Sequence, residues 1–204
     1  MVRVAINGFG RIGRTFLRTA FGHKEFEVVA INDLGSLENL AYLLKYDSVY
    51  GRAPFTVEIV DGKLMVQGKE IAFTQEREPE KLPWSAMNID VVVEATGFFA
   101  SYEGSKKHLT AGAKRVVISA PVKEGPESAG VNGATVLMGV NEDQLKVCDI
   151  SSNASCTTNA TSPLVAILKE AIGIEKAVLN TVHGYTSTQS LVDSPSKGDP
   201  RRGR

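Results

Sequence analysis

The stretch SSNASCTTNATSPL, residues 151–164, places one of the chain's two cysteines between small hydroxyl and amide residues. Apolar residues follow at helical spacing, so the sequence predicts a helix beginning near Cys156. The dipole and the free N–H groups at a helix N-terminus stabilise a thiolate and lower the pKa of its thiol. We therefore predict that Cys156 is a reactive nucleophile. Cys148, in the apolar run KVCDI, is predicted to be an inert core residue in a strand.

Pro163 leaves the start of this helix open between two alternatives. A proline either kinks a helix that begins at Cys156, or occupies the first turn of a later helix with Ser162 as its N-cap. The first alternative is the one that puts the thiol at a helix N-terminus.

His183 is the candidate base for the thiol. A helix from Cys156 to Gly173 would span about 26 Å at roughly 1.5 Å per residue. A strand from Glu175 to His183 would span about the same length at roughly 3.3 Å per residue. A strand over KAVLNTVHGYT that runs back along the helix would therefore bring His183 beside Cys156. A single histidine at a strand end is more often structural, but the matched lengths favour a catalytic pair.

Hydroxyl groups surround the predicted pair. Ser155 and Thr157 flank the thiol, and Thr186 lies three residues beyond His183. Threonines and serines also suit helix caps and strand ends. Their convergence on one thiol favours a site for an anionic substrate group such as phosphate.

A second motif is the G-x-G-x-x-G of Gly8, Gly10 and Gly13, which follows a predicted strand and opens a predicted helix. In dinucleotide-binding folds the first glycine allows a tight turn, the second lets pyrophosphate approach and the third allows helix–strand packing. Asp33 ends the next predicted strand, 20 residues past Gly13, where an acid meets the adenosine ribose. A carboxylate accepts hydrogen bonds from ribose hydroxyls and repels a 2′-phosphate, so the sequence predicts NAD rather than NADP.

The elements around these motifs follow a βαβ pattern. Apolar β-branched runs at residues 2–6, 28–31, 91–93 and 116–118 predict buried parallel strands, and residues 11–21, 36–46 and 102–112 predict helices. Residues 55–74 alternate with period two around Asp61-Gly62 and Gly68-Lys69, which predicts antiparallel hairpins. We expect an α/β fold with a Rossmann-like, doubly wound, mainly parallel sheet over residues 1–154. The start of an incomplete α+β catalytic domain should follow over residues 155–204.

Composition excludes several classes of function. The 204 residues contain 23 Lys+Arg and 23 Asp+Glu, so no net positive field attracts nucleic acid or a membrane surface. No apolar run is long enough to span a membrane, the N-terminus runs into a strand without a signal peptide, and two cysteines make no disulfide scaffold. We expect a cytoplasmic chain with no nucleic-acid or membrane partner and no metal site. Its polar tail and short second domain predict that it is part of a longer protein.

The stretches INGFGRIGR, SNASCTTNA and TVHGYTSTQ, in this order and at these separations, resemble the phosphorylating glyceraldehyde-3-phosphate dehydrogenase family. AINDL, VVVEATGFF and TAGAKRVVISAP extend the resemblance over the whole chain, and SCTTN with a downstream VHGYT is highly specific. The resemblance implies NAD as cofactor and a homotetramer. It also implies oxidation of D-glyceraldehyde 3-phosphate, with inorganic phosphate, to 1,3-bisphosphoglycerate through a cysteine thioester.

The resemblance also implies roles for individual residues. Cys156 matches the family's nucleophile and His183 its base. Substrate and phosphate positions match Ser155, Thr157 and Thr186. NAD contacts match Arg11, Ile12, Asp33, Arg77 and Ser119, in addition to the fingerprint glycines.

Two departures from the family pattern matter. The family's chain continues past DPRRGR, and Ser194 stands where NAD-specific members often carry leucine, although Pro195 fits. Two other functions stay open. Erythrose-4-phosphate dehydrogenase shares SCTTN, although the HGYT context favours the glyceraldehyde enzyme. A non-catalytic NAD-binding fragment is the second.

Overall fold

The computed structural model describes residues 1–186 and divides the chain into two compact units, residues 1–164 and residues 165–204. Ser194 and Pro195 lie outside the described residues. The predicted domain boundary between residues 154 and 155 stays a prediction.

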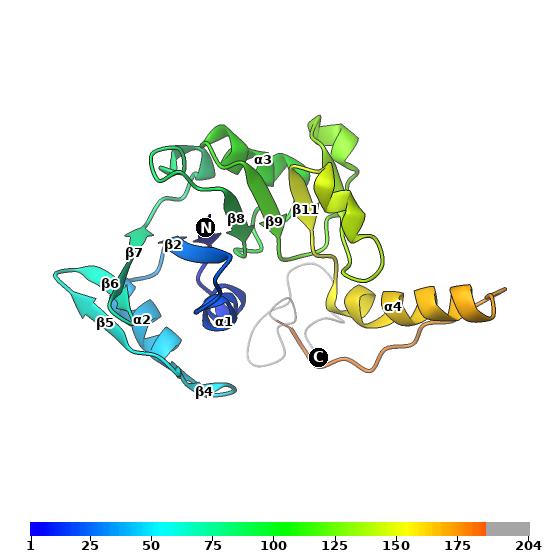
Figure 1. Ribbon diagram of the computed structural model, residues 1–204, viewed down its shortest axis with the longest axis horizontal. Helices are drawn as coiled ribbons and strands as arrows, with labels where there is room; N and C mark the ends of the chain where they lie inside the picture. The colour runs from blue at the N-terminus through cyan, green and yellow to red at the C-terminus, as the bar shows by residue number, and fades with distance from the viewer. Residues whose placement is uncertain (187–204) are drawn as a thin grey trace, which may run out of the picture. The chain divides into compact units, whose positions relative to one another are not determined.

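The first unit is built on a nine-stranded sheet in the order β10-β11-β9-β8-β1-β2-β7-β6-β5 (Figure 1). Every neighbouring pair from β10 to β7 is parallel, whereas β7-β6-β5 is antiparallel. The strands are β1 (Val2–Asn7), β2 (Phe26–Asn32), β5 (Val57–Val60), β6 (Lys63–Val66), β7 (Lys69–Thr74), β8 (Val91–Glu94), β9 (Arg115–Ile118), β10 (Gly133–Thr135) and β11 (Ile150–Ser152). A separate ribbon joins β3 (Tyr46–Asp47) to β4 (Gly51–Arg52). The predicted α/β class and parallel sheet are confirmed.

The helices cover both faces of this sheet. Alternate residues of a strand point to opposite faces, and Ala5 and Ile6 of β1 belong to different cores. The Ile6 core contains Leu17 of α1 (Arg11–Ala20) and Leu40 of α2 (Leu37–Lys45). The Ala5 core contains Tyr102 of α3 (Tyr102–Thr110). Helices α1 and α2 therefore lie on one face and α3 on the other, which is the predicted double winding.

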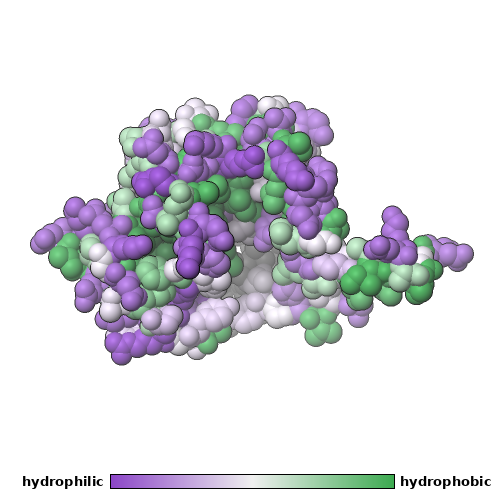
Figure 2. Space-filling view, viewed as in Figure 1, coloured by the Kyte–Doolittle hydropathy of each residue, from purple (hydrophilic) through white to green (hydrophobic). Residues whose placement is uncertain are grey.

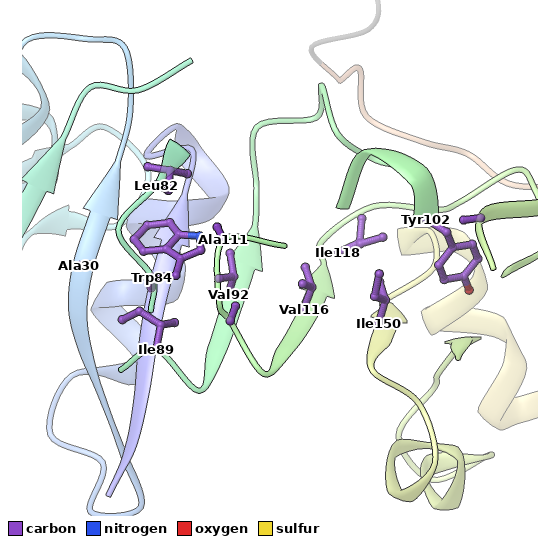
Figure 3. Close-up of a cluster of buried hydrophobic side chains, with 13 residues drawn as sticks. Ala30, Leu82, Trp84, Ile89, Val92, Tyr102, Ala111, Val116, Ile118 and Ile150 are labelled. Atoms are coloured by element: carbon purple, nitrogen blue, oxygen red, sulfur yellow. The ribbon is translucent and has the colours of Figure 1, made fainter. Parts of the chain in front are cut away.

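Trp84 is the largest fully buried side chain on the α3 face. Figure 3 shows its ring between Leu82 and Ile89, beside Val92 of β8. This segment follows the short 3₁₀ helix η1 (Pro79–Lys81). Two further 3₁₀ turns, η2 (Pro126–Ala129) and η3 (Glu142–Lys146), precede β10 and β11.

Both predicted hairpins are present. The β5–β6 turn has positive φ at Asp61 (50°) and Gly62 (75°), and the β6–β7 turn has positive φ at Gln67 (50°) and Gly68 (73°). Two consecutive positive-φ residues give the turn twist that tight hairpins prefer. The end of β7 also pairs in parallel with β2, so the insertion extends the main sheet.

The last described helix is α4 (Cys156–Ala171), which contains Pro163 in its interior. Of the two alternatives, the helix that begins at Cys156 is therefore the correct one. Apolar side chains along α4 are exposed, as the green surface in Figure 2 shows, and they include Leu164, Ile167 and Leu168.

The strand predicted over residues 176–186 is wrong, because these residues form no strand. Val178 is 96% exposed and Val182 is 100% exposed. A strand needs a neighbouring backbone to satisfy its N–H and C=O groups, and no strand pairing in the described part of the chain involves this segment. Cys148 is also not in a strand. It lies in the loop between η3 and β11, where it is buried as predicted.

Candidate functional site

The glycine loop, residues 8–10, joins β1 to α1. An added side chain would fit at Gly10 but not at Gly8 or at Gly13, in the helix that follows. Gly8 has a φ of +92°, and a Cβ there would lie 2.6 Å from the backbone nitrogen of Thr96. A Cβ on Gly13 would lie 2.2 Å from the carbonyl oxygen of Gly8. At Gly10, by contrast, a Cβ would meet nothing within 4 Å. Gly8 and Gly13 are thus required for packing, while Gly10 leaves open space for a ligand to approach the backbone.

The N-terminus of α1 is open to an anion. Gly10 is the N-cap and has no side-chain capping hydrogen bond, and the first turn contains no acidic residue. Arg11 and Ile12 in that turn are exposed. The first N–H groups of a helix, together with its dipole, form a ready binding site for phosphate groups.

Asp33 is held by backbone N–H groups on both carboxylate oxygens. Oδ2 accepts a hydrogen bond from the N–H of Phe9 (2.6 Å), and Oδ1 accepts one from the N–H of Gly35 (2.8 Å). Each carboxylate oxygen has a second acceptor position. The side chain is half-buried, so it can still accept hydrogen bonds from the hydroxyls of a ribose.

A cavity of about 660 Å³ opens at the carboxyl ends of β1, β2, β7 and β8. This is a typical size for a small-molecule site, and it lies at the switch point where the parallel strand order reverses. Its lining contains Asn7, Gly8, Gly10, Asn32, Asp33, Leu34, Glu76, Arg77, Glu78, Ala95, Thr96, Phe98 and Phe99. A ligand can approach the backbone at Gly10, and Asp33 is held in place by two N–H groups. The lining residues therefore fit a dinucleotide.

The predicted cofactor residues divide into two groups. Gly8, Gly10, Asp33 and Arg77 line the cavity. Arg11, Ile12 and Gly13 follow in α1, and Ser119 follows β9 outside the lining, where its N–H donates to the carbonyl of Glu94 (3.0 Å).

Several residues that line the cavity were not predicted from the sequence. Asn7, Asn32 and Thr96 are polar residues at or just after the ends of β1, β2 and β8. Ligands of open parallel sheets bind at the carboxyl ends of the strands. Polar residues directly after each predicted strand were therefore a usable signal.

The thiol of Cys156 lies at the first residue of α4 and is exposed. The turn before it is fixed by its own side chains. Ser155 caps the helix, since its Oγ accepts a hydrogen bond from the N–H of Thr158 (3.0 Å). Asn159 Nδ2 donates to the carbonyl of Asn153 (2.7 Å), and Ala154 adopts a φ of 57°. The backbone thus presents Cys156 in one orientation at a helix N-terminus.

The two cysteines lie in opposite environments. Cys148 is 4% exposed, and burial raises the pKa of its thiol. A buried thiol with a raised pKa reacts slowly. This contrast supports Cys156 as the reactive thiol.

The other predicted catalytic and substrate residues are divided between the two units. Thr157 is half-buried beside Cys156, whereas His183 and Thr186 are exposed residues of the second unit. His183 Nδ1 lies 2.5 Å from the carbonyl oxygen of Gly184. Because Cys156 and His183 belong to different units, their pairing stays a prediction.

Residues 1–186 contain no cluster of three or more His, Cys, Asp or Glu side chains that could hold a metal ion. In the same residues, no helix combines the length and the apolar character needed to cross a membrane.

Comparison with known proteins gives two family matches in chain order. Residues 2–102 match "Glyceraldehyde 3-phosphate dehydrogenase, NAD binding domain", and residues 155–204 match "Glyceraldehyde 3-phosphate dehydrogenase, C-terminal domain". The chain is 48% identical over 203 residues to glyceraldehyde-3-phosphate dehydrogenase of Salmonella typhimurium. It is 47% identical to glyceraldehyde-3-phosphate dehydrogenase A of Escherichia coli K12 and to the Haemophilus influenzae enzyme.

The alignments with these relatives cover the whole chain but only part of each relative. The alignments include 100% of this chain and 59% of the Salmonella and Escherichia proteins. The NAD binding domain match contains the glycine loop and Asp33, which the geometry above fits to a dinucleotide. The chain belongs to the glyceraldehyde-3-phosphate dehydrogenase family, and NAD is its cofactor.

Proposed function

We propose that the chain supplies the NAD site and the nucleophile for oxidation and phosphorylation of D-glyceraldehyde 3-phosphate to 1,3-bisphosphoglycerate. The observation that carries this proposal is the exposed Cys156 thiol at the first residue of α4. The substrate comes from the names of the relatives, which are glyceraldehyde-3-phosphate dehydrogenases.

Cys156 begins the reaction as a thiolate that adds to the aldehyde carbon and forms a hemithioacetal. His183 is the proposed base: it takes the thiol proton, gives it to the carbonyl oxygen as the hemithioacetal forms, and takes it back from the hydroxyl as the hydride leaves. When bound, NAD accepts the hydride whose loss turns the hemithioacetal into a thioester. The backbone N–H of Cys156 is the proposed donor to the oxyanion at the attacked carbon.

Inorganic phosphate then attacks the thioester carbon, the acyl–sulfur bond breaks and Cys156 leaves as thiolate. The proposed anion positions are Ser155, Thr157 and Thr186. Two of them adjoin the N-terminus of α4, whose N–H groups and dipole favour phosphate oxygens. Ser155 would serve both as N-cap and as a substrate contact.

We further propose a homotetramer, as the family resemblance implies, and a cytoplasmic location. Cys156 is exposed to water, and water in a reaction site weakens the electrostatic stabilisation of a developing charge. We therefore expect the 204-residue chain alone to show slow steady-state turnover.

The test is acylation of the chain in a single turnover. The chain is mixed with glyceraldehyde 3-phosphate and NAD without phosphate, and its peptides are analysed by mass spectrometry. An acyl adduct should form on Cys156 and disappear when phosphate is added, whereas Cys156→Ser should give none. Cys148→Ser is the matched control and should acylate normally. An adduct on Cys148, or faster acylation by erythrose 4-phosphate, would contradict the proposal.

A further inference from the structure

Buried side chains form a continuous set of hydrogen bonds across the sheet edge that bears the dinucleotide cavity. Asn7, Asn32 and Glu94 are the last residues of β1, β2 and β8, three strands adjacent in the order β8-β1-β2. They are 1%, 4% and 2% exposed, and His108 and Trp84 on the α3 side are fully buried. We call these five residues the strand-end network. The proposed chemistry uses none of them.

Trp84 fixes the protonation pattern of His108. The indole Nε1–H can only donate, and it lies 3.0 Å from Nδ1 of His108, so Nδ1 accepts. The ring proton of His108 is therefore on Nε2, which lies 3.1 Å from Oε2 of Glu94 and donates to it. This tautomer follows from the neighbours, because an indole offers no acceptor.

Glu94 is surrounded by donors. Besides the ring of His108, Oε2 accepts from Nδ2 of Asn7 (2.6 Å). Oε1 accepts from the N–H of Thr96 (2.8 Å) and from its hydroxyl. The Thr96 hydroxyl in turn accepts from the N–H of Phe98 (3.0 Å). Glu94 thus holds the loop of Thr96 and Phe98, both of which line the cavity.

The side-chain amides of Asn7 and Asn32 continue this chain of donors and acceptors to Glu76, after β7. Because Nδ2 of Asn7 faces Glu94, its Oδ1 faces Asn32 and accepts from Nδ2 of that residue (2.7 Å). Asn32 Nδ2 also donates to the carbonyl of Glu76 (2.8 Å), and Asn32 Oδ1 accepts from the N–H of Glu76 (2.8 Å). Rotating either amide by a half turn would oppose donor to donor. The network therefore ties the loop after β8 to the loop after β7.

Thr96 also sets the distance between the glycine loop after β1 and its own loop after β8. Its backbone is packed so tightly on Gly8 that no Cβ fits there. A shift of Thr96 would therefore move the glycine loop or open a gap beside it. Both loops line the cavity.

We propose that Glu94 is a positioning residue for the dinucleotide, locked in place by Trp84, His108 and Asn7. The proposal rests on the dinucleotide site described above. Glu94 holds Thr96, and Thr96 packs on Gly8. Glu94 therefore affects NAD binding by setting the shape of the cavity.

Glu94→Gln tests the centre of the network with little change in shape. The NH₂ group of glutamine would face either the donors of Asn7 and His108 or those of Thr96. In both orientations, donor groups are left without an acceptor. NAD affinity of the 204-residue chain, measured by isothermal titration calorimetry, should fall by about tenfold or more. Ile150→Val is the matched control, since Ile150 is fully buried in the α3-side core and outside the network. It should lower the thermal midpoint but leave NAD affinity unchanged.

A second pair of variants separates positioning from general stability. Asparagine Oδ1 is as many bonds from Cβ as histidine Nδ1, and glutamine Nε2 is as many bonds from Cβ as histidine Nε2. His108→Asn therefore keeps an acceptor for Trp84 and loses the donor to Glu94, whereas His108→Gln does the opposite. If Glu94 positions the cavity, His108→Gln should bind NAD close to the unaltered chain and His108→Asn at least about fivefold more weakly.

Each result decides a separate point. Equal NAD affinity for the Asn and Gln variants, or unchanged affinity for Glu94→Gln, would overturn the positioning role while leaving the NAD site intact. Failure of the unaltered chain to bind NAD would instead contradict the dinucleotide site and this inference together.

Discussion

The carboxylate of Asp33 accepts a 2.6 Å hydrogen bond from the backbone N–H of Phe9, inside the glycine loop. The residue predicted to recognise ribose is thus attached to the loop predicted to hold pyrophosphate. Any change at Asp33 will therefore act on both parts of the cofactor.

Replacing Asp33 with Ala should weaken NAD binding by about ten- to a hundredfold, since hydrogen bonds to a charged group are each worth about 1.5–3 kcal/mol. The affinity for NADP should fall less, because the repulsion of its 2′-phosphate is removed with the carboxylate. Calorimetric titration of both cofactors measures the ratio. NADP binding as tight as NAD to the unaltered chain would show that the carboxylate does not select.

Gly8→Ala and Gly10→Ala form a matched pair in one loop. A Cβ on Gly8 requires a φ of +92° and a 2.6 Å contact with backbone, so this variant should lose about 1–3 kcal/mol of unfolding free energy. Gly10→Ala meets no atom, so it should change stability by less than about 1 kcal/mol while still weakening NAD binding. Urea unfolding with and without NAD checks both. Equal stability of the two variants would contradict the packing argument.

Cys156 should be alkylated by iodoacetamide at least on the order of tenfold faster than Cys148 near neutral pH. The first thiol is exposed at a helix N-terminus, whereas burial raises the pKa of the second. Peptide mass analysis over a pH series measures each rate separately.

The His183→Asn variant tests the predicted pair in the same experiment. Removing the base should raise the pKa of the Cys156 thiol and slow its alkylation near neutral pH, with Cys148 as the internal control. A Cys156 profile that does not move would contradict the predicted pairing of Cys156 with His183.

Asp47 gives a pH dependence with a definite sign. The N–H groups of Tyr50 and Val49, followed by the Arg11 guanidinium, lower the pKa of its carboxyl to about 2. Because the folded pKa lies below the unfolded value of about 3.9, Asp47 stabilises the fold above pH ~4. This stabilisation is lost as pH falls through about 2. The stability difference between the unaltered chain and Asp47→Asn should therefore shrink between pH ~4 and ~2. A difference that stays constant over this range would contradict the assignment.

Local pattern was enough to predict the strands with β-branched runs and the two hairpins, because burial and turn chemistry act within a few residues. It did not predict β10 and β11, whose sequences GAT and ISS contain only short side chains and one isoleucine. It predicted a strand over residues 176–186 that is not formed, since strand formation depends on a pairing partner elsewhere in the chain.

The site divides in the same way. The positions of Gly8, Gly10 and Asp33 at the cavity, and of Cys156 at a helix N-terminus, were predictable because each depends on spacing along the chain. Glu94 and His108 were not, because their contact joins residues 14 apart through the packing of α3 against the sheet. No sequence periodicity in β8 or α3 predicts the contact between Glu94 and His108. The Cys156–His183 pair depends on contacts of this second kind, which is why it stays a prediction.

Trp84 is the chain's one tryptophan, and it is fully buried in the first unit. Tryptophan fluorescence therefore reports the opening of the α3-side core in which Trp84 is buried. Far-ultraviolet circular dichroism, in contrast, includes the whole of α4. A denaturation experiment that records both signals would reveal whether one cooperative transition describes the molecule, since non-coincident curves exclude two-state unfolding. A melting point read from fluorescence alone belongs to the first unit.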